Sequence, residues 1–393
     1  MNLKSEFVRS ILILLLFFAG LSFNVVAQQT ASLEKLNINS KILNQKRPIF
    51  IYTPWNYKER DLVSFDVIYV FDAQNRELFD LVHSSLGFIT NSKKFIVVGI
   101  SSPSYDNSGY YRNSDYLPKP INVTLDKYQT NNPNEENFWK YFKNEVIPFI
   151  DNSYRTTNVR YLVGHSLSAS FVLDKAINSS EMFKGFISIS PNFAYDNYRL
   201  ADDFLRINFN KPTENKFIYI SQSNEPETWA KSWAIGYNKV KTFLDSAFDY
   251  RKYTIIIKEF PEYNHWNGYL PSLLQGLTYL RSFIDKNPYS LSEIYQEIIF
   301  KITVPNKNDD AFITGNQESL GNWDPSKVKL RKVSEFEREI KLKVQFPVEF
   351  KITKGSWKSE ATTNQTTNDN ENIVITKAKN NEIRLKLIAW NGE

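Results

Sequence analysis

The chain has 393 residues, of which 42% are hydrophobic and 15% aromatic, so it can build one large domain and a smaller one, each with its own core. It contains no cysteine, which excludes disulfide bonds, thiolate metal sites, a cysteine nucleophile and a cysteine-linked lipid anchor. The formal net charge is +5, but lysines alternate with acids and form no basic cluster with interleaved aromatics. This pattern is typical of solvated surfaces and argues against a nucleic-acid partner.

The first 27 residues have the pattern of a secretory signal peptide. Lys4 and Arg9 supply the positive start, an apolar run follows from Ile11 to Leu21, and Val25-Val26-Ala27 forms a small-residue cleavage site. The apolar run is shorter than a membrane span requires. We therefore expect a secreted or periplasmic protein that is cleaved near Ala27 and meets the membrane only during export. An uncleaved anchor is the alternative.

Residues 28–288 alternate strand and helix patterns. Leu33–Asn39 and Pro48–Thr53 resemble an antiparallel edge pair, and Val67–Phe71 and Phe95–Ile100 are apolar runs, as in strands buried on both faces. Further strands are expected at Phe186–Ser190, Lys216–Ser221 and Lys252–Lys258. Helices are expected at Glu77–Leu86, Asn137–Tyr154, Ser232–Phe248 and Leu270–Ile284. The alternation predicts an α/β domain with a mainly parallel sheet.

After Lys286-Asn287-Pro288 the helical patterns end. Strand patterns follow at Ile298–Val304, Ala311–Thr314, Glu339–Phe346, Val348–Thr353, Asn372–Ile375 and Glu382–Ile388, with a polar loop at Ala361–Asn372. Closely spaced short strands predict a second domain, a β-sandwich over residues 296–393, with the boundary near residue 290.

One stretch of the first domain carries the pattern of a nucleophile. An apolar strand ending at Val163 passes through Gly164-His165-Ser166 into small residues and an apolar helix. This meets the first four positions of Gly-x-Ser-x-Gly, while Ser168 replaces the last glycine. A serine at such a turn holds its hydroxyl clear of the sheet, at the positive end of the following helix. Ser166 is therefore the candidate nucleophile.

The base is sought among three histidines. His83 lies within a predicted helix and reads as a packed or surface residue, and the side chain of His165 is expected to point away from its neighbour Ser166. His265 follows the strand Lys252–Lys258 by a short loop, Glu259–Asn264. In open α/β sheets active residues gather beyond the carboxyl ends of strands, so His265 is the candidate base, with a satisfied loop imidazole as the alternative.

A triad also needs an acid that fixes the imidazole tautomer. Glu225 lies just past the strand Lys216–Ser221 and is the first choice, with Glu227 second. The chain order Ser166, Glu225, His265 is that of α/β-hydrolases. A metal centre is not expected, because the sequence has no His-Glu-x-x-His motif and its histidines are scattered.

A set of short motifs is spread over residues 40–285: Ser40-x-x-Leu43-Asn44-x-x-Arg47, Val67–Asp72, Val98–Ile100, Arg112, Tyr116–Pro118, Glu145–Pro148, Tyr154-Arg155, Gly164–Leu167 and Ser190-Pro191. In these motifs the chain resembles the putative esterase family, which includes esterase D, feruloyl esterases and enterochelin-type esterases. The resemblance implies an α/β-hydrolase fold without a cofactor, and the triad above. It also implies an oxyanion hole built from the backbone N–H of Leu167 and one near Ala73 or Gln74. The chain departs from the family in Ser168 and in a glutamate where aspartate is commoner.

The second domain holds another set of motifs, at Phe312–Asn316, Leu320–Pro325, Phe346-Pro347, Glu349–Ile352 and Trp357. In these motifs residues 296–393 resemble a family 20 carbohydrate-binding module, the starch-binding type. The resemblance implies a glucan site built from Trp323, Trp357 and Lys351, because tryptophan rings stack on the apolar faces of sugars. The alternative is that both tryptophans belong to the core. The family's second site has aromatics near positions that here hold Lys307 and Lys341, so we expect no second site.

Together these features favour a secreted carboxylic-ester hydrolase held on starch or a related α-glucan. Two alternatives remain: an acyltransferase that uses a sugar hydroxyl in place of water, and a glycan-capture protein whose first domain has lost activity. The acyl group is left open. The long loop Ser101–Asn134 and the region Thr228–Trp233 are expected to shape the pocket.

Overall fold

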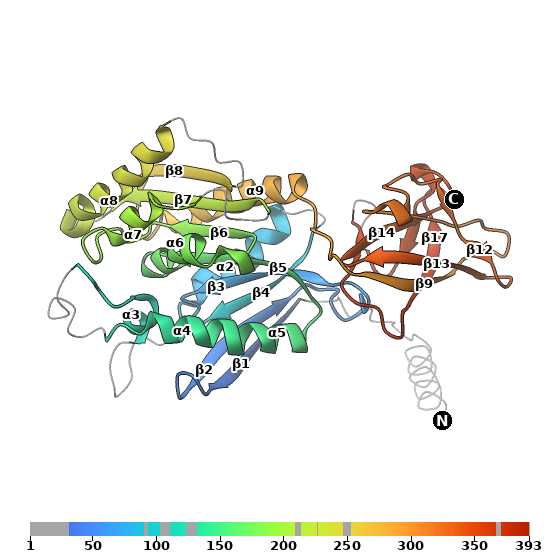
Figure 1. Ribbon diagram of the computed structural model, residues 1–393, viewed down its shortest axis with the longest axis horizontal. Coiled ribbons are helices and arrows are strands. Elements are labelled where there is room, and N and C mark those ends of the chain that lie inside the picture. The colour runs from blue at the N-terminus through green and yellow to red at the C-terminus, as the bar shows by residue number, and fades with distance from the viewer. Residues whose placement is uncertain are drawn as a thin grey trace, which may run out of the picture. The chain divides into compact units, whose positions relative to one another are not determined.

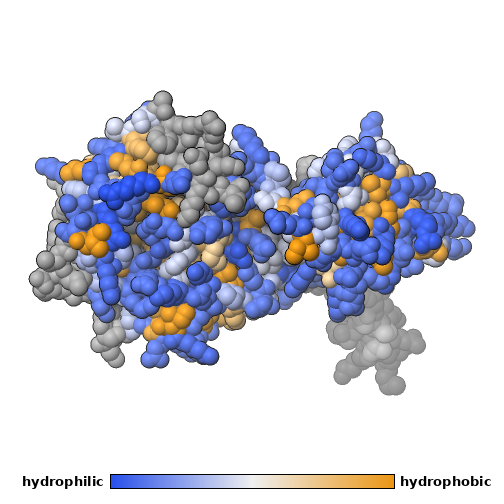
Figure 2. All heavy atoms as spheres, in the orientation of Figure 1, coloured by the Kyte–Doolittle hydropathy of each residue, from blue (hydrophilic) through white to orange (hydrophobic). Residues whose placement is uncertain are grey.

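The computed structural model describes residues 31–89, 93–102, 111–122, 132–208, 214–225, 227–246, 253–366 and 371–392. The expected signal peptide lies outside these ranges, as do parts of the loop 101–134. Among the described helices none is both long enough and apolar enough to cross a membrane. The visible surface is mainly hydrophilic with small separate apolar patches, as the alternating charges predict (Figure 2).

The first domain is built on one eight-stranded sheet in the order β1-β2-β4-β3-β5-β6-β7-β8 (Figure 1). Its strands are β1 (Ser32–Ser40), β2 (Gln45–Thr53), β3 (Phe65–Phe71), β4 (Phe95–Ile100), β5 (Thr156–His165), β6 (Gly185–Ile189), β7 (Lys216–Asn224) and β8 (Tyr253–Asn264). β1 and β2 form the antiparallel edge, and the strands from β4 to β8 run parallel. This confirms the α/β prediction and puts the ends of β3, β5, β7 and β8 at one edge of the sheet.

Helices cover both faces of this sheet, which is why β3 is buried along its whole length. α2 (Arg76–Ile89) and α9 (Tyr269–Lys286) pack on one face, where Ile68 and Val70 point. On the other face lie α3 (Tyr111–Tyr116), α4 (Glu135–Tyr141), α5 (Ile147–Ser153), α6 (Leu167–Asn178), α7 (Arg199–Phe204) and α8 (Glu227–Asp245). Tyr69 and Phe71 point into that second layer, as the two-residue period of a strand requires.

The predicted helix Asn137–Tyr154 is correct in extent but not in regularity. α4 and α5 are joined by a π-helical turn, Phe142–Val146, and Pro148 follows in the first turn of α5. Proline has no N–H and crowds the carbonyl one turn earlier, so the chain widens there. The short helices α3 and α7 fall in segments with no helical prediction, because six residues hold too little periodicity to recognise.

Residues 295–390 form the β-sandwich. One sheet has the order β11-β10-β14-β16 and the other β12-β13-β9-β17-β15. The strands are β9 (Tyr295–Thr303), β10 (Phe312–Gly315), β11 (Val328–Lys329), β12 (Arg331–Lys332), β13 (Glu337–Gln345), β14 (Val348–Thr353), β15 (Ala361–Thr363), β16 (Ile373–Ile375) and β17 (Glu382–Trp390). Phe300 of β9 meets Phe350 of β14 edge-on, with ring centroids 5.5 Å apart, in the core between the sheets. β11, β12 and β15 escaped prediction because each has only two or three residues.

Buried polar contacts join residues 60–64 of the first domain to the sandwich. Arg60 donates to the carboxylate of Glu371 at 2.7 Å and to the carbonyl of Gln365 at 2.6 Å. The amide of Ser64 donates to the carbonyl of Val374 at 2.8 Å. Both Arg60 and Glu371 are buried, so this ion pair is shielded from solvent.

Candidate active site

The turn between β5 and α6 carries Ser166. Its backbone has φ 60° and ψ −120°, a strained conformation for a residue other than glycine and the one expected of a nucleophile elbow. A Cβ atom on Gly164 would lie 2.4 Å from the carbonyl oxygen of Ser168, so only glycine fits where the helix passes the strand end. Leu167 is the first residue of α6 and follows the serine directly.

Ser168, which replaces the last glycine of the motif, has a defined structural role. Its hydroxyl accepts a hydrogen bond from the amide of His165 at 3.0 Å and donates to the carbonyl of the same residue at 2.9 Å. The first turn of α6 is thereby bonded to the last residue of β5. The hydroxyl is fully buried, and a glycine could not make either bond.

His265 and Glu225 are brought together by the parallel pairing of β7 with β8. Nδ1 of His265 donates to Oε2 of Glu225 at 2.5 Å, and the other carboxylate oxygen accepts from Nε2 of Gln222 at 2.8 Å. Both members of the pair are buried, and the Trp233 ring stands edge-on to His265 with centroids 5.5 Å apart. A carboxylate on Nδ1 holds the proton there and directs Nε2 to the opposite side of the ring.

The segment that precedes His265 has a different secondary structure from the one predicted. The segment Glu259–Asn264, predicted as a loop, continues β8, so His265 follows the strand at once. The pairing of β7 with β8 shifts register between Ser223 and Asn224, where Asn224 faces Asn264. This irregularity lets the strand continue past the point where its apolar pattern stops.

His165 connects the elbow to the candidate base. Its Nε2 lies 2.9 Å from the backbone carbonyl of His265, and the two imidazole centroids are 4.7 Å apart. The structure therefore brings the residue next to Ser166 against His265, although the two histidines are 100 positions apart. No local pattern predicts this contact, since a buried histidine in a Gly-x-Ser motif has no pattern of its own.

The loop after β3 holds the second group of oxyanion candidates. The amide of Ala73 donates to the carbonyl of Ile100 at 3.0 Å and is thus already engaged. The side chain of Gln74 bridges two neighbours, donating to Asp72 at 2.8 Å and accepting from the amide of Ser102 at 2.8 Å. Asp72 has a positive φ of 63°, so the backbone turns sharply before these amides.

Arg112 and Tyr116, from the long loop, hold Asp72 in place. The guanidinium donates to both oxygens of the Asp72 carboxylate, at 2.8 and 2.9 Å, and the Tyr116 hydroxyl accepts from the Asp72 amide at 3.1 Å. Burial and the nearby charge of Asp72 raise the pKa of Tyr116, so its hydroxyl remains neutral. The loop 101–134 therefore reaches the turn that carries Gln74.

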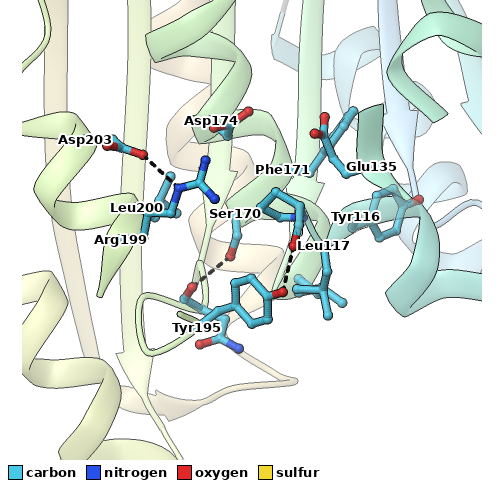
Figure 3. A pocket seen from close by; sticks show the side chains of 13 residues that line it. Tyr116, Leu117, Glu135, Ser170, Phe171, Asp174, Tyr195, Arg199, Leu200 and Asp203 are labelled. Atoms are coloured by element: carbon cyan, nitrogen blue, oxygen red, sulfur yellow. Dashed lines mark hydrogen bonds and ion pairs between the residues drawn. The ribbon is translucent and has the colours of Figure 1, made fainter. Parts of the chain in front are cut away.

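A small pocket of about 40 Å³ lies one helical turn beyond the candidate nucleophile Ser166, at Ser170 (Figure 3). Leu167 and Ser170 of α6 line it, and Leu117 closes it from the long loop. The hydroxyl of Ser170 donates to the carbonyl of Asn192 at 3.1 Å, and that of Tyr195 donates to the carbonyl of Pro118 at 2.7 Å. The wall is mainly apolar, but Glu135, Asp174 and the Arg199–Asp203 ion pair also line it, as Figure 3 shows.

The candidate glucan residues lie on neighbouring segments of the sandwich. Trp357 is 46% exposed and Trp323 half-buried, so neither is a fully buried core residue. The hydroxyl of Thr353 donates to the carbonyl of Pro325 at 2.6 Å, which holds the loop of Trp323 beside the end of β14. Lys351 is mostly buried, and its ammonium pairs with Glu360.

Lys341, which stands near a position where the starch-binding family's second site has an aromatic residue, pairs with Glu297 at 2.8 Å. The side chain of Glu227, the second choice for the acid, lies outside the described residues, although its backbone begins α8. In the part of the chain that the structure describes, His, Asp and Glu side chains form no cluster suited to a metal ion.

The comparisons with known proteins agree with this architecture. Residues 40–280 match the putative esterase family, and residues 296–384 match the starch binding domain. An IroE-like serine hydrolase from Shewanella oneidensis superposes with a TM-score of 0.53 and 20% identity, over 64% of this chain and 80% of that one. The siderophore hydrolase EstB from Aspergillus nidulans superposes with a TM-score of 0.52 and 16% identity, over 66% of this chain and 96% of that one. The BES protein from Bacillus cereus superposes with a TM-score of 0.51 and 19% identity, over 65% of this chain and 95% of that one. A search of curated proteins found no significant match.

Proposed function

The chain belongs to the putative esterase family, and we propose that it is a serine ester hydrolase with Ser166, His265 and Glu225 as its catalytic triad. The observation that carries this proposal is the 2.5 Å hydrogen bond from Nδ1 of His265 to Glu225, at the same edge of the sheet as the strained Ser166. We also propose that the protein is exported and that its sandwich binds starch or a related α-glucan.

In the proposed mechanism the hydroxyl of Ser166 attacks the ester carbonyl while Nε2 of His265 takes its proton. Glu225 accepts from Nδ1 throughout, which keeps Nε2 available as the acceptor and stabilises the imidazolium that forms. His265 then returns the proton to the leaving alcohol, and water repeats the sequence on the acyl-enzyme. The reaction needs no cofactor.

Backbone N–H groups stabilise the negative charge that develops on the carbonyl oxygen, by donating hydrogen bonds to it. Leu167 supplies one, at the start of α6, where the helix dipole adds to the effect. Between the two remaining candidates we choose Gln74, because the amide of Ala73 already donates to Ile100. Each such donor contributes ~3–4 kcal/mol to transition-state stabilisation.

The test is hydrolysis of short-chain aryl esters by purified protein, compared with Ser166→Ala. The variant should lose turnover completely while its unfolding temperature and starch retention stay unchanged. Wild-type turnover in Ser166→Ala would reject the nucleophile. A parallel assay with maltose as acceptor separates hydrolysis from transfer: acyl-maltose in place of free acid would identify an acyltransferase on the same triad.

The tethering half of the proposal has a separate test. Insoluble starch should retain the wild-type protein. The protein should also deacylate an acylated starch faster than a soluble ester with the same acyl group at equal ester concentration, because binding raises the local concentration of ester around the enzyme. If starch does not retain the protein, the esterase assignment still stands, but starch is rejected as the binding partner of the sandwich.

A further inference from the structure

We propose that His165 is a positioning residue, whose imidazole holds the backbone of His265 and so sets the base against Ser166. The inference rests on the triad proposed above and adds to it a residue outside the three reacting side chains. It starts from one contact, Nε2 of His165 to the carbonyl oxygen of His265 at 2.9 Å.

The chemistry of this contact defines the state of His165. A carbonyl oxygen only accepts hydrogen bonds, so Nε2 of His165 must carry a proton and donate it. The side chain is 3% exposed and packs against the rings of Trp266 and Tyr269, with centroids 5.8 and 5.2 Å away. These walls leave the imidazole little rotational freedom, so the direction of its N–H is set by packing.

The imidazole of His165 is also uncharged at neutral pH, because burial disfavours its charged form. Burial, with a smaller effect from neighbouring His265, lowers its pKa from 6.5 to about 3. A neutral ring suits the catalytic cycle, since a second positive charge 4.7 Å from His265 would oppose the imidazolium that forms there during turnover. His165 is thus a fixed dipole and takes no part in proton transfer.

The other end of the link is anchored by Ser168. Its hydroxyl bonds to both the amide and the carbonyl of His165, so the ring is carried on backbone that is tied to the first turn of α6. The same turn begins with Leu167, the proposed oxyanion donor. A path of hydrogen bonds therefore runs from α6 through Ser168 and His165 to the backbone of His265, without passing through the reacting atoms.

The decisive comparison is between two substitutions of His165. His165→Gln keeps an N–H donor at nearly the position of Nε2, whereas His165→Leu keeps an apolar side chain of moderate size and removes the donor. We expect kcat on a short-chain aryl ester to fall ~100-fold in His165→Leu, the loss that a small misplacement of a catalytic group brings. His165→Gln should recover most of it. KM should change little in either variant, because the ring is buried and offers a substrate almost no surface to contact.

A second measurement reports the reactivity of the Ser166 hydroxyl itself. The rate at which an alkyl fluorophosphonate labels Ser166 depends on the same base and should fall in parallel with kcat. The unfolding temperature is measured on each variant. Equal kcat in His165→Leu and wild type, or equal losses in His165→Leu and His165→Gln, would contradict the inference, since packing alone would then explain the residue. If His165→Leu does not fold, Ser168→Ala decides: lower kcat and slower labelling support the link, and unchanged values contradict it.

Failure of this inference can be told from failure of the proposed triad. An active Ser166→Ala protein rejects the triad whatever the His165 variants do. An inactive Ser166→Ala protein combined with a fully active His165→Leu protein retains the triad and rejects only the positioning role.

Discussion

Glu225 and His265 stand 40 residues apart in the chain, and their side chains meet at 2.5 Å in a buried site. β7 and β8 are adjacent parallel strands, so their carboxyl ends lie side by side and the residues that follow them are close together. Gln222 donates to the second carboxylate oxygen, which orients Glu225 toward the imidazole. The acid of the proposed triad is thus held from two sides.

Glu225→Gln should lower kcat by ~10³–10⁴-fold, as removal of the buried carboxylate does in a serine protease triad. The amide would present either an N–H or a carbonyl to Nδ1 and no longer stabilise an imidazolium. The matched control is Glu227→Gln, two residues on at the start of α8, which should stay within a few-fold of wild type. Steady-state kinetics on one aryl ester decide between them, and the reverse ranking would move the acid to Glu227.

The fold could be predicted because its elements carry local signatures. β3 is a run of apolar residues buried on both faces, and the alternation of such runs with helices indicates a parallel sheet. Ser166 lies in a short motif, and only three histidines compete for the role of base. These features depend on residue type and order, which a sequence displays directly.

What could not be predicted depends on contacts between distant residues. The choice between Ala73 and Gln74 follows from the bond of the Ala73 amide to Ile100, which no local pattern announces. The extension of β8 to Asn264 follows from a register shift against β7. His165 was expected to point away from Ser166, but the contact that its ring makes with the carbonyl of His265 was not foreseen.

Gly164→Ala should abolish activity and lower the unfolding temperature, because the new Cβ would lie 2.4 Å from backbone atoms of Ser168 that cannot move aside. The control is Gly87→Ala in α2, where a Cβ meets nothing within 4 Å. There the substitution should stabilise the protein by ~0.5–1 kcal/mol, since alanine favours a helix more than glycine does. Thermal unfolding of both variants, with the aryl ester assay, checks the pair. A folded and active Gly164→Ala protein would show that the elbow is less tightly packed.

Arg47→Met should destabilise the first domain by ~3–5 kcal/mol, the usual effect of leaving one charge of a buried ion pair without its partner. Arg47 bonds to Asp115, and both side chains are almost completely buried. Burial raises the pKa of Asp115, and the Arg47 charge opposes that rise. The exposed pair of Lys140 with Glu136 is the control, and Lys140→Met should leave the urea midpoint nearly unchanged. Similar urea midpoints for the two variants would contradict the claim that loss of the buried ion pair costs more stability than loss of the exposed one.

Acid should destabilise the protein through His165. Its pKa falls from 6.5 to about 3 on folding, because burial and neighbouring His265 disfavour its charge, an effect to which Arg112 adds and which Asp72 opposes. Between these values the unfolded chain binds a proton that the folded chain does not, so stability is full above pH 6.5 and falls as the pH drops toward 3. The slope from this one group is at most ~1.4 kcal/mol per pH unit. His165→Gln should flatten the unfolding temperature across this window, and an unchanged slope would assign the acid sensitivity to other groups.

Trp323 and Trp357 form the proposed starch site. They lie on segments held together by the bond from Thr353 to Pro325, and neither residue is fully buried. Stacking of a glucose ring on tryptophan should contribute ~1–2 kcal/mol, by analogy with aromatic contacts in proteins. Losing this at one site lowers affinity roughly tenfold. Trp323→Ala/Trp357→Ala should therefore lose retention on insoluble starch.

The control is Phe88→Ala, which removes a ring that is 86% exposed on α2 in the first domain and should leave starch retention unchanged. Turnover of a small soluble ester should be nearly equal in all three proteins, because the tryptophans lie in the sandwich. Turnover of a starch-borne ester should fall only in the double variant, since tethering supplies local concentration and not chemistry. Undiminished retention of a folded double variant would reject these tryptophans as the site. Lost retention with undiminished turnover of the polymer-borne ester would retain the site and reject tethering as the reason that the two domains are joined.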